Sequence, residues 1–263
     1  MADIENQMPS SPPADGGPFV WFQPPTGDTS PSSLESPLLK SATIQIRKDF
    51  VKKVYGIFAV QLLVTVAVAM PFVLSKAVQS AVAANHWVVF VLCLASIAVS
   101  VCYAGDPSLM RVFPWNYLAL SGLTVIEGTL VGLICSAYSI DSVLIAVAMT
   151  CAIVAALTAL AVFTETDFTG YVPYLFTAGV SLVVFGIILL LLPTVPILHV
   201  LYSYVGAFIF SCYIILDTQM ILGGKHRRYQ FGVDDYAFAA LAIYLDVVNL
   251  FIQLLKILGE KKK

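Results

Sequence analysis

Long apolar stretches alternate with short polar breaks along most of this chain. Each stretch has about 19 to 25 residues, the length that a helix rising about 1.5 Å per residue needs to cross roughly 30 Å of hydrocarbon. Membrane-spanning strands would need only about ten residues with strict alternation, which is not seen here. The pattern predicts an all-α integral membrane protein, a seven-helix bundle with helices near residues 54–74, 86–104, 114–136, 142–163, 172–192, 198–222 and 236–258.

Two short segments flank the predicted membrane domain of residues 41–259. Residues 1–40 hold eight of the fourteen prolines, five acids and one base, which predicts a disordered tail. Residues 260–263 form a basic C-terminal tail. Basic residues at 47–53 precede the first apolar run and predict a cytosolic N-terminus. Seven crossings would place the C-terminal lysines outside, against the positive-inside rule, whereas a re-entrant last segment would not, and the sequence leaves both arrangements open.

Composition narrows the class of protein further. The chain is 59% hydrophobic and only 11% charged, whereas a soluble domain carries about 25% charged residues, so lipid must cover much of its surface. The net charge of −2 gives no reason to expect nucleic acid as a partner. The five cysteines form no C-x-x-C pair and lie in or beside apolar runs, where we expect small buried side chains and no bound metal or other cofactor.

Three acidic residues lie within the apolar runs, namely Glu127, Asp217 and Asp246. An ionised acid near the bilayer centre costs roughly 2.5–3.5 kcal/mol and normally faces the protein interior or a water-filled cavity. Asp217 lies about five residues before the polar loop at 223–235 and Asp246 about ten residues after it, so both belong to the same half of the membrane. Two neighbouring carboxyls are expected to share a proton, which makes them a candidate proton sensor and cation ligand. The alternative is a pair of protonated acids that only join helices.

The last apolar run carries a polar stripe. Asp246, Asn249 and Gln253 are spaced i, i+3 and i+7, so they share one helix face within an otherwise apolar segment. This predicts that the last helix is central and that Asn249 and Gln253, together with Glu127, face a pore. An interhelical hydrogen-bond ladder is the alternative interpretation. Gly128 and Gly132 beside Glu127 would permit close helix approach.

Several stretches resemble the Bax-inhibitor/Lifeguard family, and in particular its Lifeguard branch. They are AIYLDVVNLFIQLLKILG at 242–259, SCYIILDTQMILGG at 211–224, RKDFVKKVYGIFAVQLLVT at 47–65, FPWNY at 113–117 followed by Glu127-Gly128, and T-D-F-T at 166–169. The resemblance covers roughly residues 41–259. It implies a seven-helix fold with the last helix at the centre, ringed by the other six.

The same resemblance implies a function. The family is expected to provide a pH-sensitive passive calcium leak across an intracellular membrane and to suppress programmed cell death. Its paired sensor aspartates correspond to Asp217 and Asp246, which would also bind calcium transiently. Its gating arginine corresponds best to Arg111, although the family's basic run is reduced here to that one residue. Its partners would be the lipid bilayer, calcium, protons and cell-death regulatory proteins.

The sequence is also compatible with functions other than a calcium leak. The chain could be a non-conducting adaptor that binds cell-death regulators, or a proton-coupled cation exchanger. An intramembrane aspartyl protease would need G-x-G-D and P-A-L motifs, which are missing, so the chain is not expected to be an enzyme. We expect the first helix to direct the chain to the endoplasmic reticulum, with final residence there, in the Golgi, in the vacuole or in the plasma membrane.

Overall fold

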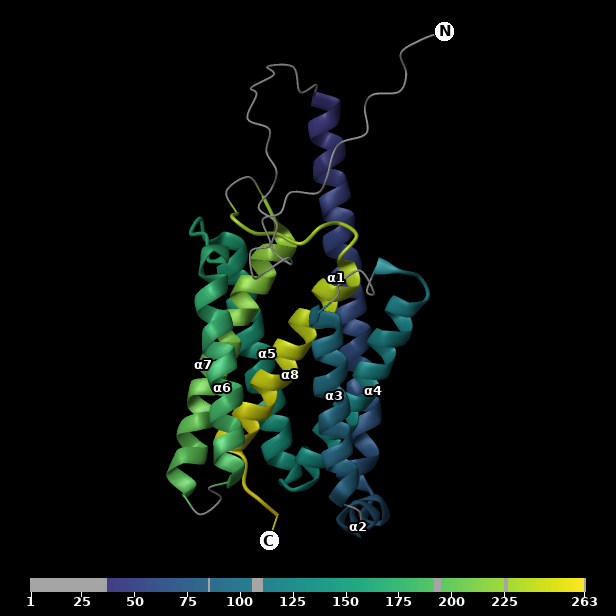
Figure 1. The fold of residues 1–263 in the computed structure, drawn as a ribbon, viewed down its shortest axis with the longest axis vertical. Coiled ribbons are helices and arrows are strands. Elements are labelled where there is room, and N and C mark those ends of the chain that lie inside the picture. The colour runs from purple at the N-terminus through teal and green to yellow at the C-terminus, as the bar shows by residue number, and fades with distance from the viewer. Residues whose placement is uncertain (1–36, 85, 106–110, 192–194, 225–226, 263) are drawn as a thin grey trace, which may run out of the picture.

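The computed structural model describes residues 37–84, 86–105, 111–191, 195–224 and 227–262, which are almost entirely helical (Figure 1). The elements are α1 (Pro37–Leu74), α2 (Lys76–Ala84), α3 (His86–Gly105), α4 (Trp115–Ser136), α5 (Ile140–Phe163), the 3-10 turn η2 (Thr169–Tyr171), α6 (Val172–Leu191), α7 (Pro196–Leu222) and α8 (Tyr236–Leu258). Within these ranges the extended backbone contacts amount to one isolated bridge between Tyr138 and Lys261. The predicted disordered tail lies outside the described residues, except that its last four residues begin α1.

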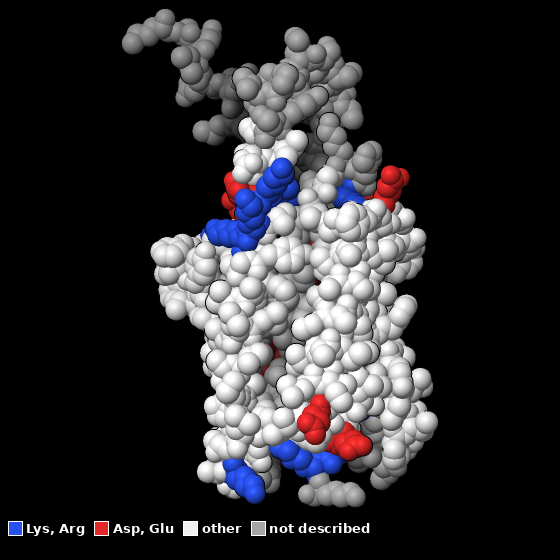
Figure 2. Space-filling model, turned by 180° about the vertical axis from the view of Figure 1, so that it is seen from behind, with Lys and Arg blue, Asp and Glu red and all other residues white. Residues whose placement is uncertain are grey.

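The surface of the bundle is that of a multi-pass membrane protein. Among the described residues, six helices are long and apolar enough to cross a membrane, and they comprise residues 42–74, 115–136, 140–163, 169–189, 196–222 and 236–258. Within α3 the comparable apolar part is the shorter Val91–Ser100. Large apolar side chains such as Leu63, Phe163 and Phe208 are exposed, and Figure 2 shows a belt with almost no charged side chains on its surface between two charged ends. Exposing an apolar surface of this size to water is unfavourable, so we assign it as the surface that faces lipid.

The first helix is longer than its apolar pattern predicts. It begins at Pro37 rather than near residue 54, because the basic stretch at 41–53 continues the same helix without a break. Phe50 and Val54 are already buried there, so this polar part of α1 has a packed face. The short helix α2 was not predicted at all. Ser75 separates it from α1 and accepts a bond from the Val78 amide at 3.4 Å, as an N-cap residue does.

The helices α1 and α3 to α8 run alternately between two ends of the bundle (Figure 1). We call the end with the start of α1 the proximal end. The loops 164–171 and 223–235 lie there too, because Arg47 of α1 and Arg227 bridge them. The opposite, distal end holds α2, the α4–α5 turn and the C-terminus. The Ser139 amide donates to the Glu260 carbonyl at 3.0 Å, so α8 crosses the whole bundle.

The last helix is the most buried of the candidate spans. In the most apolar 18-residue segment of α8, 72% is buried inside the bundle, compared with 11% in the corresponding segment of α5. It packs mainly against α1, α4, α5 and α7, whereas α3 packs on α4 and α6 packs on α7. Among the described helices, α8 is therefore the innermost of the candidate spans. The surrounding helices do not all contribute equally to the ring, since α3 and α6 occupy outer positions.

Small residues set the contact between α1 and α4. A side-chain carbon placed on Gly132 would lie 2.9 Å from the Ala69 Cα, and one on Gly128 would lie 3.2 Å from the Thr65 Cα. Only glycine at these two positions lets the α1 backbone approach so closely. The predicted Gly128–Gly132 motif thus contacts α1, while the adjacent Glu127 points to a different neighbour.

Candidate functional site

The candidate site is formed where α7 and α8 pack side by side. Gly223 ends α7 with φ +62°, a left-handed conformation that favours glycine, and the chain then reverses direction. The two helices are consequently antiparallel and in close contact. This brings Asp217 of α7 and Asp246 of α8, predicted to lie in the same half of the membrane, into the same interface. The two residues are only 5% and 9% exposed.

The two carboxyl groups interact directly. They are close enough for one to hydrogen-bond to the other. The Asp246 Oδ2 atom has no hydrogen-bond partner among the described residues. In that part of the chain the ion pairs of Asp and Glu involve Asp49, Asp167 and Asp235, and neither Asp217 nor Asp246. Two buried carboxyls without a compensating cation cannot both ionise cheaply, so the pair is suited to holding one proton between them.

Hydroxyl groups surround the carboxyl pair. The Tyr55 hydroxyl of α1 lies beside Thr218 and within electrostatic range of Asp217. The Tyr213 ring lies near both aspartates and donates its hydroxyl to the Leu175 carbonyl at 2.7 Å. In the described ranges no group of three or more His, Cys, Asp or Glu side chains could hold a metal. A cation here would have only two carboxyls, so water must supply its remaining ligands.

The polar stripe of α8 divides into two kinds of residue. Gln253 is 4% exposed and its Oε1 atom has no partner in the described structure. Asn249 is half-buried and donates to the Leu245 carbonyl of its own helix at 2.8 Å. Asp246 and Gln253 thus point into the bundle, while the Asn249 amide is engaged by its own backbone.

The third intramembrane acid lies elsewhere. Glu127 of α4 accepts a hydrogen bond from the Ser96 hydroxyl of α3, so its carboxylate sits at the α3–α4 contact. Tyr244 of α8 lies within electrostatic range of it, and Tyr244 is itself hydrogen-bonded to Thr65 at 2.8 Å. The structure therefore brings Glu127 towards α3 and does not join it to the aspartate pair.

Arg111 lies at the proximal end and faces a different acid from the aspartate pair. Its Nε donates to Asp235 Oδ1 at 2.7 Å, immediately before α8 begins. The hydrogen bond and charge of Asp235 raise the pKa of Arg111 above its ordinary value. The arginine is half exposed, so any action on the buried pair would have to pass through the start of α8.

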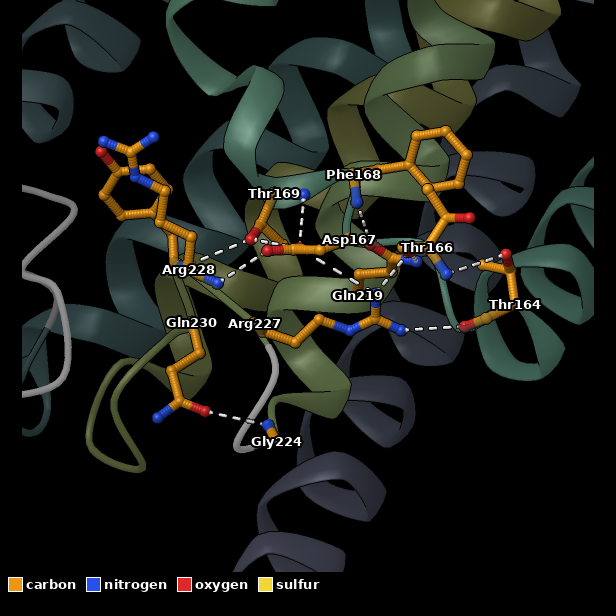
Figure 3. A network of polar contacts seen from close by, with 11 residues as sticks. Thr164, Thr166, Asp167, Phe168, Thr169, Gln219, Gly224, Arg227, Arg228 and Gln230 are labelled. Atoms are coloured by element: carbon orange, nitrogen blue, oxygen red, sulfur yellow. Dashed lines mark hydrogen bonds and ion pairs between the residues drawn. The ribbon is translucent and has the colours of Figure 1, made fainter.

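A second polar cluster, not predicted from the sequence, covers the proximal end of α7 (Figure 3). Gln219 lies two residues after Asp217 and is fully buried. Its Oε1 accepts from the Phe168 amide at 2.8 Å, and its Nε2 donates to the Thr166 carbonyl at 3.0 Å. The Gln219 side chain therefore satisfies one backbone N–H and one backbone carbonyl of the α5–α6 loop, as a neighbouring strand would.

Two arginines complete this loop cluster. Arg227 donates to the Thr166 carbonyl at 2.6 Å and to the Thr164 carbonyl at 3.2 Å. The Arg228 amide donates to Asp167 Oδ2 at 2.9 Å. Burial by itself raises the pKa of Asp167, but hydrogen bonds from Thr169 and Arg228 and the charge of Arg227 outweigh it, so the pKa lies below its ordinary value.

Arg47 joins three segments at the same end of the bundle. Its guanidinium donates to the carbonyls of Met220 at 2.5 Å, Leu222 at 3.1 Å and Phe231 at 2.6 Å. It therefore binds the last carbonyls of α7, which a helix leaves without partners, and the loop that follows. The sequence predicted for Arg47 only a place in the basic segment that precedes the first apolar run. Partners more than 170 residues away leave no local signal that could have revealed this contact.

These features define a class, that of polytopic helical membrane proteins with a buried carboxyl pair beside a central last helix. The chain belongs to the family described as inhibitor of apoptosis-promoting Bax1, whose model matches residues 47–263. It is 32% identical over 223 residues to human Protein lifeguard 3, covering 82% of this chain and 70% of the human protein. The mouse Protein lifeguard 3 is also 32% identical, with 71% of its length covered. Protein LIFEGUARD 4 of Arabidopsis thaliana is 33% identical over 235 residues, covering 86% and 88% of the two chains.

The predicted family is thereby confirmed. Membership identifies the chain as a multi-pass membrane protein of a family linked to inhibition of apoptosis.

Proposed function

We propose that this protein is a pH-sensitive passive calcium leak in an intracellular membrane, and that the leak contributes to suppression of programmed cell death. The observation that carries the proposal is the contact between the buried carboxyls of Asp217 and Asp246, which have no ion-pair partner in the described structure. A proton bound between them and a cation bound between them would compete for the same oxygens.

Calcium suits such a site chemically. It takes six to eight hard oxygen ligands at flexible distances. Two carboxyls and nearby hydroxyls such as those of Tyr55 and Thr218 provide only part of that set, so the ion would keep several waters. A partly hydrated, incompletely coordinated ion is released easily, which suits conduction better than storage. Calcium is therefore the transported ion here and not a resident cofactor, and we assign no catalytic role to the aspartates.

The proposal includes a topology of seven crossings with the proximal end in the cytosol. Basic residues near the ends of membrane spans are retained on the cytosolic side. In the described ranges the proximal end carries Arg47, Lys48, Lys52, Lys53, Arg111, Arg227 and Arg228, and the distal end carries Lys76, Lys256, Lys261 and Lys262. The aspartate pair would then lie in the cytosolic half of the membrane. We assign the protein to the endoplasmic reticulum, where the first helix would direct it.

Calcium efflux from proteoliposomes across about pH 5 to 8 tests the proposal. Wild type, Asp217→Asn, Asp246→Asn and the double variant are compared with Asp141→Asn, a control at an exposed acid in the first turn of α5. We expect a pH-dependent leak in wild type and in the control, an altered pH dependence in the single variants, which keep one carboxyl, and a leak without pH dependence in the double variant, because two amides carry no titrating proton.

Two results would redirect the assignment. A wild-type flux no greater than that of empty liposomes at any pH would overturn the leak and favour a non-conducting adaptor that binds cell-death regulators. Calcium accumulation against its gradient, driven by an imposed proton gradient, would replace the leak with proton-coupled exchange. Both measurements use the same vesicles, so the three functions are separated in one preparation.

A further inference from the structure

Unpartnered polar atoms are concentrated in one part of the bundle. In the described ranges five buried side-chain oxygens lack a hydrogen-bond partner of good geometry, and they belong to Tyr55, Gln61, Thr218, Asp246 and Gln253. All five residues lie on α1, α7 or α8, three helices that contact one another. A buried polar atom without a partner costs about 1–3 kcal/mol, so each such atom requires an explanation such as water or an ion.

In the described part of the chain, the buried polar side chains of the other helices have hydrogen-bond partners. Thr124 of α4 and Thr150 of α5 each donate to a carbonyl of their own helix, and Asn116 of α4 donates to the Tyr236 hydroxyl. A general shortage of hydrogen bonds therefore cannot explain the pattern. The unpartnered oxygens instead belong to α1, α7 and α8, whose buried polar atoms are suited to binding water.

Gln253 is the member of this set that the carboxyl pair does not explain. Its side chain sits against Gly206 of α7, where an added side-chain carbon would lie 3.1 Å from its Cγ and Cδ atoms and 3.2 Å from its Nε2. The missing side chain at position 206 thus provides the space for a buried amide between α7 and α8. The residue is 4% exposed, its Nε2 is the amide atom nearest to position 206, and its Oε1 has no hydrogen-bond partner among the described residues.

Gln253 and the carboxyl pair occupy successive positions along the same interface. Asp246 and Gln253 are seven residues apart, about 10 Å along α8. Asp217 and Gly206, their neighbours on α7, are eleven residues apart, about three turns and nearly the same face. Between them lie Ile214, Val247 and Leu250, which belong to one apolar cluster together with Leu254 beside Gln253. From the proximal to the distal end, the α7–α8 interface therefore contains the polar carboxyl pair, then apolar side chains, then the polar amide of Gln253.

We propose that Gln253, seated on Gly206, is a second binding position for a partly hydrated cation, on the distal side of this apolar barrier. The inference rests on the proposed leak and extends its path beyond the carboxyl pair. A neutral amide oxygen is a hard ligand of the kind calcium accepts. Without a charge it binds an ion more weakly than a carboxylate does, so an ion that passes the barrier would be released towards the distal end.

Water access to position 253 can be measured without any calcium flux. The five native cysteines are replaced by alanine, and single Gln253→Cys and Leu250→Cys variants of the full chain are reconstituted in liposomes. Leu250 is fully buried on the same helix, within the apolar barrier, and serves as the matched control. The probe is 2-aminoethyl methanethiosulfonate, a small cationic thiol reagent, and labelling is followed by intact mass. We expect position 253 to react at least about tenfold faster than position 250, and equal rates would overturn the inference.

Calcium efflux then tests the role of the site. Gln253→Leu and Gly206→Ala should each reduce the leak about tenfold and keep its pH dependence, because the carboxyl pair is intact. Gly122→Ala is the control, since an added carbon there meets no atom within 4 Å. A Gln253→Leu variant that leaks like wild type would overturn the second position. If wild type does not leak but position 253 is labelled fast, the hydrated site stands and the proposed calcium leak fails.

Discussion

Two sites with acidic residues lie near the last turns of α7, and they differ in the hydrogen-bond and charge partners of their carboxyl groups. The loop acid Asp167 accepts hydrogen bonds from Thr169 and from the Arg228 amide and lies 3.9 Å from the Arg227 guanidinium. The interior acid Asp246 has another acid as its neighbour, and its Oδ2 has no hydrogen-bond partner among the described residues. The first site is electrostatically satisfied and serves to hold backbone in place. The second has no ion-pair partner in the described structure, and under the proposed function a proton or a cation binds there.

The two sites are connected through a single helical segment. Asp217 belongs to the interior pair, and Gln219, two residues later, binds the α5–α6 loop that contains Asp167. The loop cluster therefore fixes the end of the helix on which the interior pair depends. If this division between a holding site and a responding site is right, substitutions in the two sites should affect stability and pH response separately.

The largest effect is expected on the pH response, from Asp246→Asn. The variant should flatten or shift the pH dependence of calcium efflux, because only the Asp217 carboxyl remains to titrate, while its melting temperature in detergent stays equal to or above that of wild type. Removing charge from an uncompensated buried pair costs little and can stabilise a fold. Thermal unfolding followed by intrinsic fluorescence gives the stability. A variant that melts markedly earlier would show that the pair holds helices together, as the hydrogen-bond ladder interpretation requires.

The next largest effect is expected on stability, from Gln219→Leu. This change leaves the Phe168 amide and the Thr166 carbonyl without side-chain partners, which should cost roughly 1–3 kcal/mol. The matched control is Gln45→Leu, at an exposed glutamine of α1 that contacts only Asp49 in the described contacts. Chemical denaturation in detergent measures both variants. If the two variants are equally stable, the bonds of Gln219 do not stabilise the contact between α7 and the α5–α6 loop.

A smaller and pH-dependent effect is expected for Asp167→Asn. Because the folded-state pKa of Asp167 is depressed, its stabilisation is fully present above the unfolded-state pKa of about 3.9 and is lost as pH falls through the folded value. The variant should therefore be less stable than wild type by about 1 kcal/mol at neutral pH. The difference should shrink in acid, below about pH 4. Denaturation curves at several pH values check the sign, and a gap that widens in acid would contradict it.

The smallest stability effect is expected for Arg111→Ala. Its ion pair with Asp235 is about half exposed on the arginine side, and such pairs contribute under about 1 kcal/mol. If Arg111 acts as a gating latch through the start of α8, the variant should raise calcium efflux with an unchanged melting temperature. Asp235→Asn should do the same, since it removes the other half of the pair. Unchanged efflux in both variants would leave Arg111 with no part in gating.

Sequence predicted the helices better than it predicted their polar contacts. In the described residues each predicted apolar run agrees with a helix to within one residue or lies inside a longer one, because length and hydropathy are local properties. The depth of Asp217 and Asp246 could also be read locally, by counting residues from one loop. The contacts of Arg47 and Gln219 could not, because their partners lie 51 to 184 residues away and are backbone groups, which carry no residue identity. Asn249 shows the limit of helical spacing, which gives the face of a side chain but not whether its own backbone already binds it.

The central position of α8 has a consequence for biosynthesis. A chain is made from its N-terminus, so the helices that surround α8 are all inserted into the membrane before it. Until α8 arrives, the faces of α1, α4, α5 and α7 that it will cover have no final neighbour, and Asp217 has no second carboxyl. The order of synthesis therefore runs from the shell to the centre. Assembly of the bundle and assembly of the carboxyl pair are the same late event.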